Sequence, residues 1–420
     1  MARAATAKML LVLAVAIVAV AVLSGCGGLS SALIVPGGSR LTIYSSLPLQ
    51  GAGAAVSDQI INGERLALAE AGGHVGRFSV SFVSYDDSSR SNDQWNASDT
   101  ATNAADAAHD ISTIAYLGDY DSPATAISLP LINGARILQV SPASPYVGLT
   151  DPQFAGMDEP DRFYPTQART FARLAPDDYV QGAALVDFMK LQGVHSLYVV
   201  GDQDEFDSSL SAIVAQDAKA DGLHVVAADT IDSDIHTFKS EATKIAASGA
   251  QAMFYGGGAT PSTANLWQEV YSDDPAMRLF GSSSANVPSF TAGLGAAATN
   301  LYLGSATLPT ELYDADAQRV LRSYRQHFDQ VPTADALYGY EAMHLVLEAI
   351  ARAGRHGNDR KAVVGAFFNL GLQQSVLGAL QISSSGDSNI AEYGIDRIQN
   401  GAPVFMRVIR VAQTGPPASV

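Results

Sequence analysis

The 420-residue chain contains one cysteine, Cys26, so no disulfide can form within it and its core must be stabilised by packing. Positive charge is also scarce, because 25 Lys and Arg residues stand against 42 Asp and Glu residues, a net charge of −17. An acidic surface disfavours nucleic acid and anionic membrane surfaces, which both require clustered Lys and Arg. The apolar run at residues 9–23 has 15 residues, fewer than the roughly 20 needed to span a bilayer.

Motifs of enzymes and metal sites are absent or incomplete. The eight histidines are scattered without metal-ligand spacing, and no Gly-x-Ser-x-Gly elbow occurs. Gly51-Ala52-Gly53-Ala54-Ala55-Val56 resembles a dinucleotide fingerprint, but Val56 replaces its third glycine, and Gly256-Gly257-Gly258 lacks the rest of a phosphate loop. We therefore predict no enzymatic activity, no cofactor and no metal; a dinucleotide-dependent enzyme is the remote alternative.

The N-terminus has the order of a secretory signal. Arg3 and Lys8 precede the apolar run, which ends in Leu23-Ser24-Gly25-Cys26. This tetrapeptide resembles the lipobox of bacterial lipoproteins, which implies removal of residues 1–25 and a lipid on Cys26 that tethers the protein to the membrane. The alternative is an uncleaved anchor helix with an incidental cysteine. In both cases the remaining chain works outside the cytoplasm.

Cleavage would leave 395 residues, too many for one ordinary core, so we predict two domains. Loss of Arg3 and Lys8 would change the net charge from −17 to −19. Residues 26–39 are mostly small and predict a flexible tether. A hydrophobic fraction of 47% with 16% charged residues is typical of a packed globular protein.

From Arg40 onward, strand-like and helix-like segments alternate. Strands are predicted first at residues 41–45, 78–82, 111–117 and 137–140, then at 197–200, 224–228, 252–255, 279–281 and 301–306, and last at 404–411. A polar, proline-rich stretch at 141–176 separates the first two groups. Regular alternation indicates parallel sheets covered by helices on both faces, so the predicted fold class is α/β with two doubly wound lobes.

Several short motifs occur in a definite order along this succession of segments. They are Pro48-Leu49-Gln50-Gly51, Asn62-Gly63, Tyr85-Asp86-Asp87, Val140-Ser141-Pro142-Ala143, Arg173-Leu174-Ala175-Pro176-Asp177-Asp178 and Tyr340-Glu341-Ala342. Their order from about residue 41 to the C-terminus resembles the type I periplasmic binding proteins, specifically the branched-chain amino acid (Leu/Ile/Val) substrate-binding proteins of ABC transporters. The resemblance implies a monomer that captures a small solute and delivers it to ABC permease subunits.

The resemblance also implies three crossovers between the lobes, near residues 169–176, 305–309 and 385–395. The first lobe would contain residues 40–171 and 310–388, and the second lobe residues 172–309 and 389–415. We expect these crossovers to act as a hinge that closes both lobes over the solute.

Ligands of parallel α/β sheets bind at the carboxyl ends of the strands, beside helix N-termini. Ser122, followed by Pro123, is predicted to be the N-cap of a helix whose free N–H groups favour an anion. By resemblance, Ser122, Ser141, Ala143 and Ser144 would hold a ligand carboxylate. The other predicted ligand-binding residues are Gln50, Phe206, Tyr255, Gly257 and Ser283. The alternative is that Ser122 is only a cap and Ser141-Pro142 only a turn.

The second lobe departs from the family pattern. Asp204-Glu205-Phe206-Asp207 stands where the family has Asp-x-x-Tyr-Gly, and Pro145 replaces a threonine. Ser283 stands near the family's ammonium-binding glutamate and cannot compensate a buried ammonium. We therefore hypothesise that the ligand is not an ordinary α-amino acid, although Asp202, Asp204 or Glu205 could supply the missing charge.

The same two-lobed cleft would also suit a ligand-sensing extracytoplasmic receptor subunit that signals to a membrane kinase. The residues do not discriminate this alternative from an importer, because both functions need the same capture of a solute. Neighbouring permease or kinase genes would discriminate between them.

Overall fold

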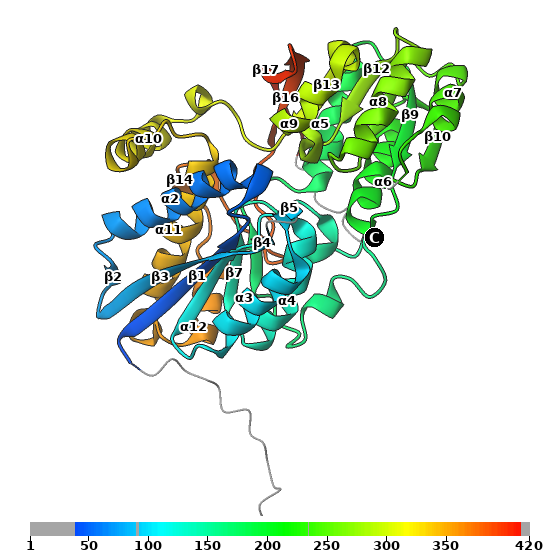
Figure 1. Ribbon diagram of the computed structural model, residues 1–420. Coiled ribbons are helices and arrows are strands. Elements are labelled where there is room, and N and C mark those ends of the chain that lie inside the picture. The colour runs from blue at the N-terminus through cyan, green and yellow to red at the C-terminus, as the bar shows by residue number, and fades with distance from the viewer. Residues whose placement is uncertain (1–37, 90–91, 234, 413–420) are drawn as a thin grey trace, which may run out of the picture. The chain divides into compact units, whose positions relative to one another are not determined.

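The computed structural model describes residues 38–89, 92–233 and 235–412, where the chain forms two sheets with their covering helices (Figure 1). The predicted signal peptide, Cys26 and nearly all of the predicted tether lie outside the described residues. Both sheets are built mainly of parallel strands with helices on both faces, which confirms the predicted fold class. Within the described residues, no helix is both long and apolar enough to cross a bilayer.

The first sheet has the strand order β2-β3-β1-β6-β7-β8. Its strands are β1 (Arg40–Leu47), β2 (His74–Val75), β3 (Phe78–Asp86), β6 (Thr113–Gly118), β7 (Leu138–Ser141) and β8 (Phe171–Arg173). All of them run parallel except β2, which pairs antiparallel with β3. Residues 41–47 of β1 are all buried, as expected for a central strand that helices cover on both faces.

Two groups of helices cover the first sheet. α2 (Ala54–Glu70), α10 (Ala315–Phe328), α11 (Asp335–Ala353) and α12 (Arg360–Phe368) share one core, and α3 (Ala97–His109) and α4 (Ser122–Gly134) share another. Ile43, Leu66 and Met343 of the larger core are at most 2% exposed. Each such side chain stabilises the fold by roughly 1.5–3 kcal/mol.

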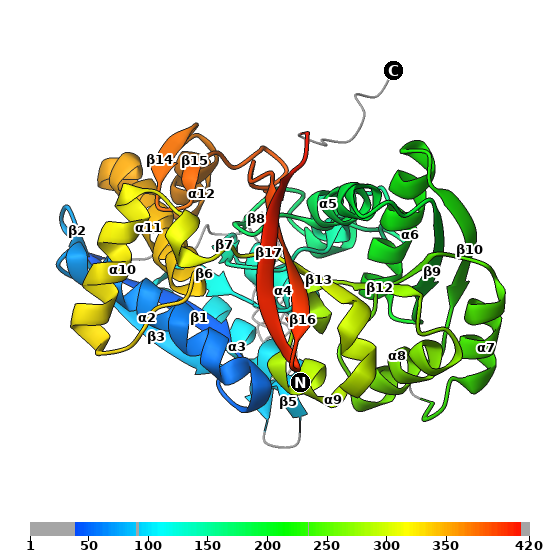
Figure 2. The ribbon, with the colours of Figure 1, turned by 90° about the horizontal axis from the view of Figure 1, so that it is seen from above.

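The second sheet has the order β10-β9-β11-β12-β13-β16-β17. Its strands are β9 (Ser196–Gly201), β10 (His224–Thr230), β11 (Ala252–Tyr255), β12 (Arg278–Gly281), β13 (Leu301–Ser305), β16 (Glu392–Gln399) and β17 (Ala402–Arg410). The first five are parallel, and β16 and β17 form an antiparallel hairpin beside them (Figure 2). α5 (Asp178–Leu191) and α6 (Glu205–Ala220) share one core with this sheet, and α7 (Lys239–Ala247) and α8 (Pro261–Asp273) another.

The five parallel strands follow the same spatial order in both sheets. When the parallel strands of each sheet are numbered in chain order, their spatial order is 2-1-3-4-5. This order is β3-β1-β6-β7-β8 in the first sheet and β10-β9-β11-β12-β13 in the second. The connections therefore change direction between β1 and β6 and again between β9 and β11. In doubly wound sheets, ligands bind at the carboxyl ends of strands at such a switch point.

The chain passes between the elements of the two sheets three times. It leaves β8 for α5, leaves β13 for the short helical turn η6 (Thr310–Leu312), and returns to β16 after the small hairpin of β14 (Gln373–Ser375) and β15 (Gly378–Leu380). The lobe boundaries and a hinge at these connections remain predictions.

Several features differ from the predicted elements. β16 was not predicted, and the stretch at 141–176 contains β8, which joins the first sheet. A further small hairpin, β4 (Ser88–Ser89) with β5 (Asn92–Trp95), precedes α3. α6 begins at Glu205, so Glu205 and Phe206, which stand where the family has Asp-x-x-Tyr-Gly, lie in the first turn of a helix.

α2 and α11 cross with their backbones in direct contact. A Cβ atom on Gly63 would lie 2.1 Å from the carbonyl oxygen of Ala336, and one on Gly339 would lie 2.0 Å from that of Ile60. Backbone atoms cannot move aside as a flexible side chain would. The crossing therefore requires glycine on both helices.

We expect Gly63→Ala to lower the free energy of unfolding by roughly 2 kcal/mol or more, because the new methyl group overlaps the backbone of α11. The matched control is Gly365→Ala in α12, where an added Cβ would meet no atom within 4 Å. That variant should raise stability by about 0.5–1 kcal/mol, because alanine favours the helix. Urea unfolding of both variants measures the difference, and equal effects would contradict the close helix crossing.

Candidate functional site

Gln50 lies in the loop that follows β1 at the switch point of the first sheet. Its side-chain N–H donates to Asp86 (2.7 Å), and its backbone N–H donates to the Ser88 hydroxyl (3.0 Å). Burial disfavours the charge of Asp86, but hydrogen bonds from Ser88, Leu49 and Gln50 outweigh it and lower the pKa of that carboxyl. The predicted ligand residue Gln50 thus also fixes the shape of its own loop.

Ser122 lies at the start of α4, directly after β6. The prediction that Ser122 is the N-cap is wrong, because Asp121 has the extended N-cap conformation and Ser122 is the first helical residue. The Ser122 hydroxyl oxygen instead accepts a hydrogen bond from the backbone N–H of Tyr146 (3.2 Å). That contact uses a lone pair, and within the described residues the Ser122 hydroxyl has no acceptor, so its proton is available to a ligand.

The loop after β7 holds the other predicted serines beside Ser122. Ser141 donates to the carbonyl of Asp119 (2.6 Å) and accepts from the N–H of Ala143 (3.1 Å). Ser144 is fully buried with a φ of +51°, and its hydroxyl lies 2.7 Å from that of Thr125. Both hydroxyls therefore bind groups within the loops. Among these serines, Ser122 is the one whose hydroxyl proton has no acceptor in the described part of the chain.

Acidic side chains lie under these loops. Asp119 is fully buried and accepts hydrogen bonds from the hydroxyls of Tyr116 (3.1 Å) and Ser128. Burial raises the pKa of Asp119 to about 7. Burial likewise raises the pKa of Asp121, the N-cap of α4, to about 6. Within the described residues, no group of three or more His, Cys, Asp and Glu side chains could hold a metal ion.

In the second sheet, a hydrogen bond connects the carboxyl ends of β9 and β11. The buried Tyr255 hydroxyl donates to Asp202 (3.2 Å). A Cβ on Gly257 would lie 2.1 Å from the Tyr255 hydroxyl and 2.5 Å from the Asp202 carboxylate. Gly257 is thus required by packing, and Asp202, which we considered as a partner for an ammonium, is already engaged with Tyr255.

Ser283 follows β12 and is connected to a carboxyl group that the sequence reasoning missed. Its backbone N–H donates to the side-chain oxygen of Gln181 (2.7 Å), and the Gln181 amide donates to Asp178 (2.7 Å). Asp178 is buried, and burial raises its pKa to about 7. The signal was the motif Pro176-Asp177-Asp178, which was interpreted only as a crossover.

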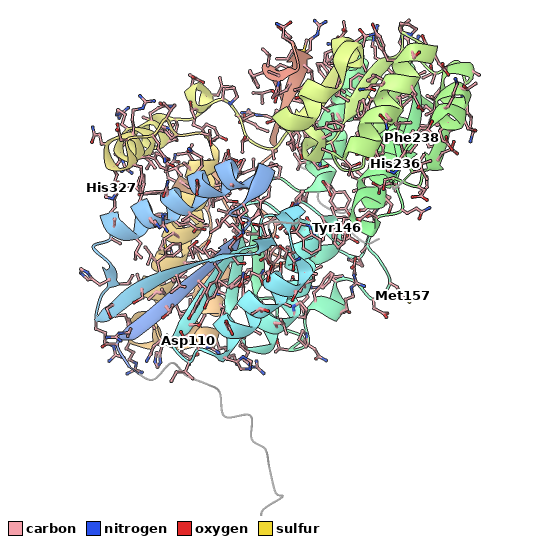
Figure 3. All side chains as sticks on the ribbon, in the orientation of Figure 1. Asp110, Tyr146, Met157, His236, Phe238 and His327 are labelled. Atoms are coloured by element: carbon pink, nitrogen blue, oxygen red, sulfur yellow. The ribbon has the colours of Figure 1, made fainter. Side chains whose placement is uncertain are left out.

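Phe206 is the second residue of α6. Its ring packs edge-on against Tyr146, labelled in Figure 3, with ring centroids 4.7 Å apart. The Asp204 carboxylate caps the helix by accepting from the N–H of Phe206 (2.9 Å), whereas the Glu205 side chain lies outside the described part. The contact brings the predicted aromatic ligand residue against the loop that holds Ser122.

The sequence model of a family described as periplasmic binding protein matches residues 42–402. The chain therefore belongs to the type I periplasmic binding protein family. Membership of this family implies an extracytoplasmic location and a role in binding small solutes rather than in catalysis. The predicted resemblance is confirmed. No curated protein sequence matches the chain significantly.

Solved structures share the fold at low sequence identity. A leucine binding protein, LivK, from Thermotoga maritima is 21% identical, with a TM-score of 0.71 over 88% of this chain and 99% of that chain. A substrate-binding protein of an ABC transporter from Desulfitobacterium hafniense, in complex with Leu, is 19% identical (TM-score 0.70; 87% and 100% covered). A solute binding protein from R. palustris in complex with 4-hydroxybenzoate is 15% identical (TM-score 0.70; 88% and 97% covered).

Asp87, directly after β3, provides a pH test of this acidic region. Burial and the nearby Asp119 and Asp121 raise its pKa far above the ordinary aspartate value. The folded protein therefore keeps a proton that the unfolded chain releases above about pH 4, and stability falls as the pH rises toward the folded-state pKa. Between pH 5 and 8, the wild type should lose about 1–3 kcal/mol more stability than Asp87→Asn.

Urea unfolding at both pH values measures this difference. The matched control is Glu311→Gln, which removes an exposed carboxyl group and should leave the pH dependence of stability unchanged. Parallel pH profiles for the wild type and Asp87→Asn would show that Asp87 is ionised in the folded protein.

Proposed function

We propose that the protein is an extracytoplasmic solute-binding lipoprotein of an ABC importer, which captures a small polar or carboxylate solute between its lobes. The observation that carries the proposal is the placing of Ser122, with a free hydroxyl proton, beside the start of α4 at a switch point. The side chain of the N-cap Asp121 makes no capping hydrogen bond, so the first N–H groups of α4 are not capped by it. Uncapped N–H groups and a hydroxyl donor suit a carboxylate or another acceptor group.

The loops of the second sheet indicate which group of an amino acid would find no partner in the site. Ser283 stands near the position of the glutamate that would hold an ammonium, and Asp202 is engaged with Tyr255. The buried Asp178 is two hydrogen bonds from Ser283, but its raised pKa leaves it partly neutral near pH 7. A solute without an α-ammonium therefore fits better than leucine, and the R. palustris protein with 4-hydroxybenzoate shows that the fold accepts such a solute.

Capture would proceed by closure at the three connections between the sheets. The solute would bind first at the loops of the first sheet, and the second lobe would then close over it. Only a higher affinity of the solute for the closed form can shift the population toward closure. The closed form would then present both lobes to the permease.

A thermal-shift screen of the purified full-length protein in mild detergent tests the ligand class. The panel is L-leucine, L-isoleucine, L-valine, their amides, benzoate and 4-hydroxybenzoate, each at pH 5.5 and 7.5. A solute at 100 times its Kd should stabilise the protein by about 2.7 kcal/mol. We expect a carboxylate without an amine to bind, and more tightly at pH 5.5 than at pH 7.5, because the raised pKa of Asp121 leaves that side chain less charged at the lower pH.

Ser122→Ala should weaken the binding of that carboxylate roughly tenfold, because it removes one hydrogen bond to a charged group. Strong binding of leucine alone, unaffected by pH, would contradict the proposed ligand class while leaving the fold assignment intact. Small-angle scattering with the bound solute should show compaction, and unchanged scattering at saturation would contradict closure.

The lipid anchor has its own test. In a bacterial host, the wild type should incorporate labelled palmitate, whereas Cys26→Ala should not, because it lacks the acceptor sulfur. Ser24→Ala is the matched control, since alanine also satisfies the lipobox pattern and labelling should persist. Labelling of Cys26→Ala, or loss of labelling in Ser24→Ala alone, would contradict lipidation at Cys26.

A further inference from the structure

Arg173 ends β8 at the first connection between the two sheets, and its side chain is fully buried. A buried guanidinium needs partners for its five N–H groups, because an unpaired charge inside a protein is strongly destabilising. The described contacts of Arg173 go to two different parts of the chain, and both are relevant to the proposed ligand site.

The first set of contacts holds the loop after β7. One terminal nitrogen of Arg173 donates to the backbone carbonyls of Ser144 (2.6 Å) and Tyr146 (2.7 Å). The other donates to the Thr150 hydroxyl (2.5 Å). These bonds form a planar fork that lysine, with a single ammonium, could not reproduce.

The second set reaches the chain that leads into the third connection. The Arg173 Nε–H donates to Asp387 (2.9 Å), and the Arg173 backbone N–H donates to the carbonyl of Gly386 (2.9 Å). Gly386 has a φ of +112°, and a Cβ there would lie 2.2 Å from the carbonyl oxygen of Phe171. Thr150 closes the set by donating to Asp387 (2.8 Å).

Tyr146 connects the contacts of Arg173 with Ser122. Its carbonyl accepts from Arg173, and its N–H donates to the Ser122 hydroxyl oxygen. One residue therefore connects the buried guanidinium with the serine whose proton is free, and its ring also packs on Phe206 of α6. A shift of the Arg173 fork would move the Tyr146 backbone and thereby the direction of the Ser122 hydroxyl.

We propose that Arg173, held by Asp387, is a positioning residue that sets the ligand-binding orientation of Ser122 and couples it to the first and third connections between the lobes. The proposal deepens the proposed function and rests on it for the role of Ser122. Asp387 is 21% exposed in its side chain, so its pair with Arg173 is largely shielded from water and from salt.

The test uses the full-length protein and Asp387→Asn, which keeps the size of the side chain and removes its charge. Hydrogen–deuterium exchange should rise about tenfold in peptides that cover residues 119–125 and 144–150, while peptides from β9 and β11 stay unchanged. The matched control is Asp221→Asn, which removes the exposed ion pair with Lys190 (2.8 Å) and should change neither loop. A uniform rise across the whole chain, or no rise in the two loops, would overturn the proposal.

Binding of 4-hydroxybenzoate and L-leucine, used in turn as probes, supplies a second readout. For the probe that binds the wild type, Asp387→Asn should raise the Kd about tenfold, and the double variant with Ser122→Ala should bind no more weakly than Ser122→Ala alone. Fully additive losses would overturn the coupling. If neither probe binds the wild type, the exchange experiment alone decides the positioning role.

Arg173→Lys provides a check on the fork itself, because it keeps the charge and loses the bidentate geometry. It should raise loop exchange as Asp387→Asn does. Wild-type exchange in Arg173→Lys would show that charge alone is sufficient and would overturn the role of the fork.

Discussion

The shared strand order of the two sheets is the constraint on which the candidate site depends. Parallel strands gather their carboxyl ends at one edge, and the change of direction between β1 and β6 leaves that edge without a crossing connection. The loops that carry Gln50, Ser122 and Ser144 follow β1, β6 and β7 at that edge. The same order in the second sheet places Tyr255 and Ser283 at an equivalent edge.

Most polar groups at these edges bind one another. Ser141, Ser144 and Tyr255 use their hydroxyls inside the loops, as buried polar groups generally must. This internal pairing gives the site rigid walls, so that few groups remain for a solute. A preformed site with few free donors favours a small ligand with one strong acceptor group.

The sequence predicted the architecture better than the roles of individual residues. The strand at 252–255 was predicted at its observed bounds, because its four residues form a short apolar run. β16 was missed because a bulge between Ile395 and Asp396 interrupts its two-residue alternation. Ser122 was found, but its lone pair is taken by Tyr146, 24 residues along the chain. Asp178 was missed because its link to Ser283 passes through Gln181, and only the folded chain shows this contact.

Charge limits the solutes that the site can accept. A solute carboxylate at α4 gains from the helix N-terminus, but Asp121 repels it whenever that side chain is ionised. Burial opposes the ionisation of Asp178 by raising its pKa, and Tyr255 already donates a hydrogen bond to Asp202, so neither carboxyl group is a ready partner for an ammonium. A solute with a single carboxylate and no other charge needs no partner for an ammonium. Its binding is opposed only by the charge of Asp121. These charges are the reason why we propose an uncharged or singly anionic solute and not a zwitterion.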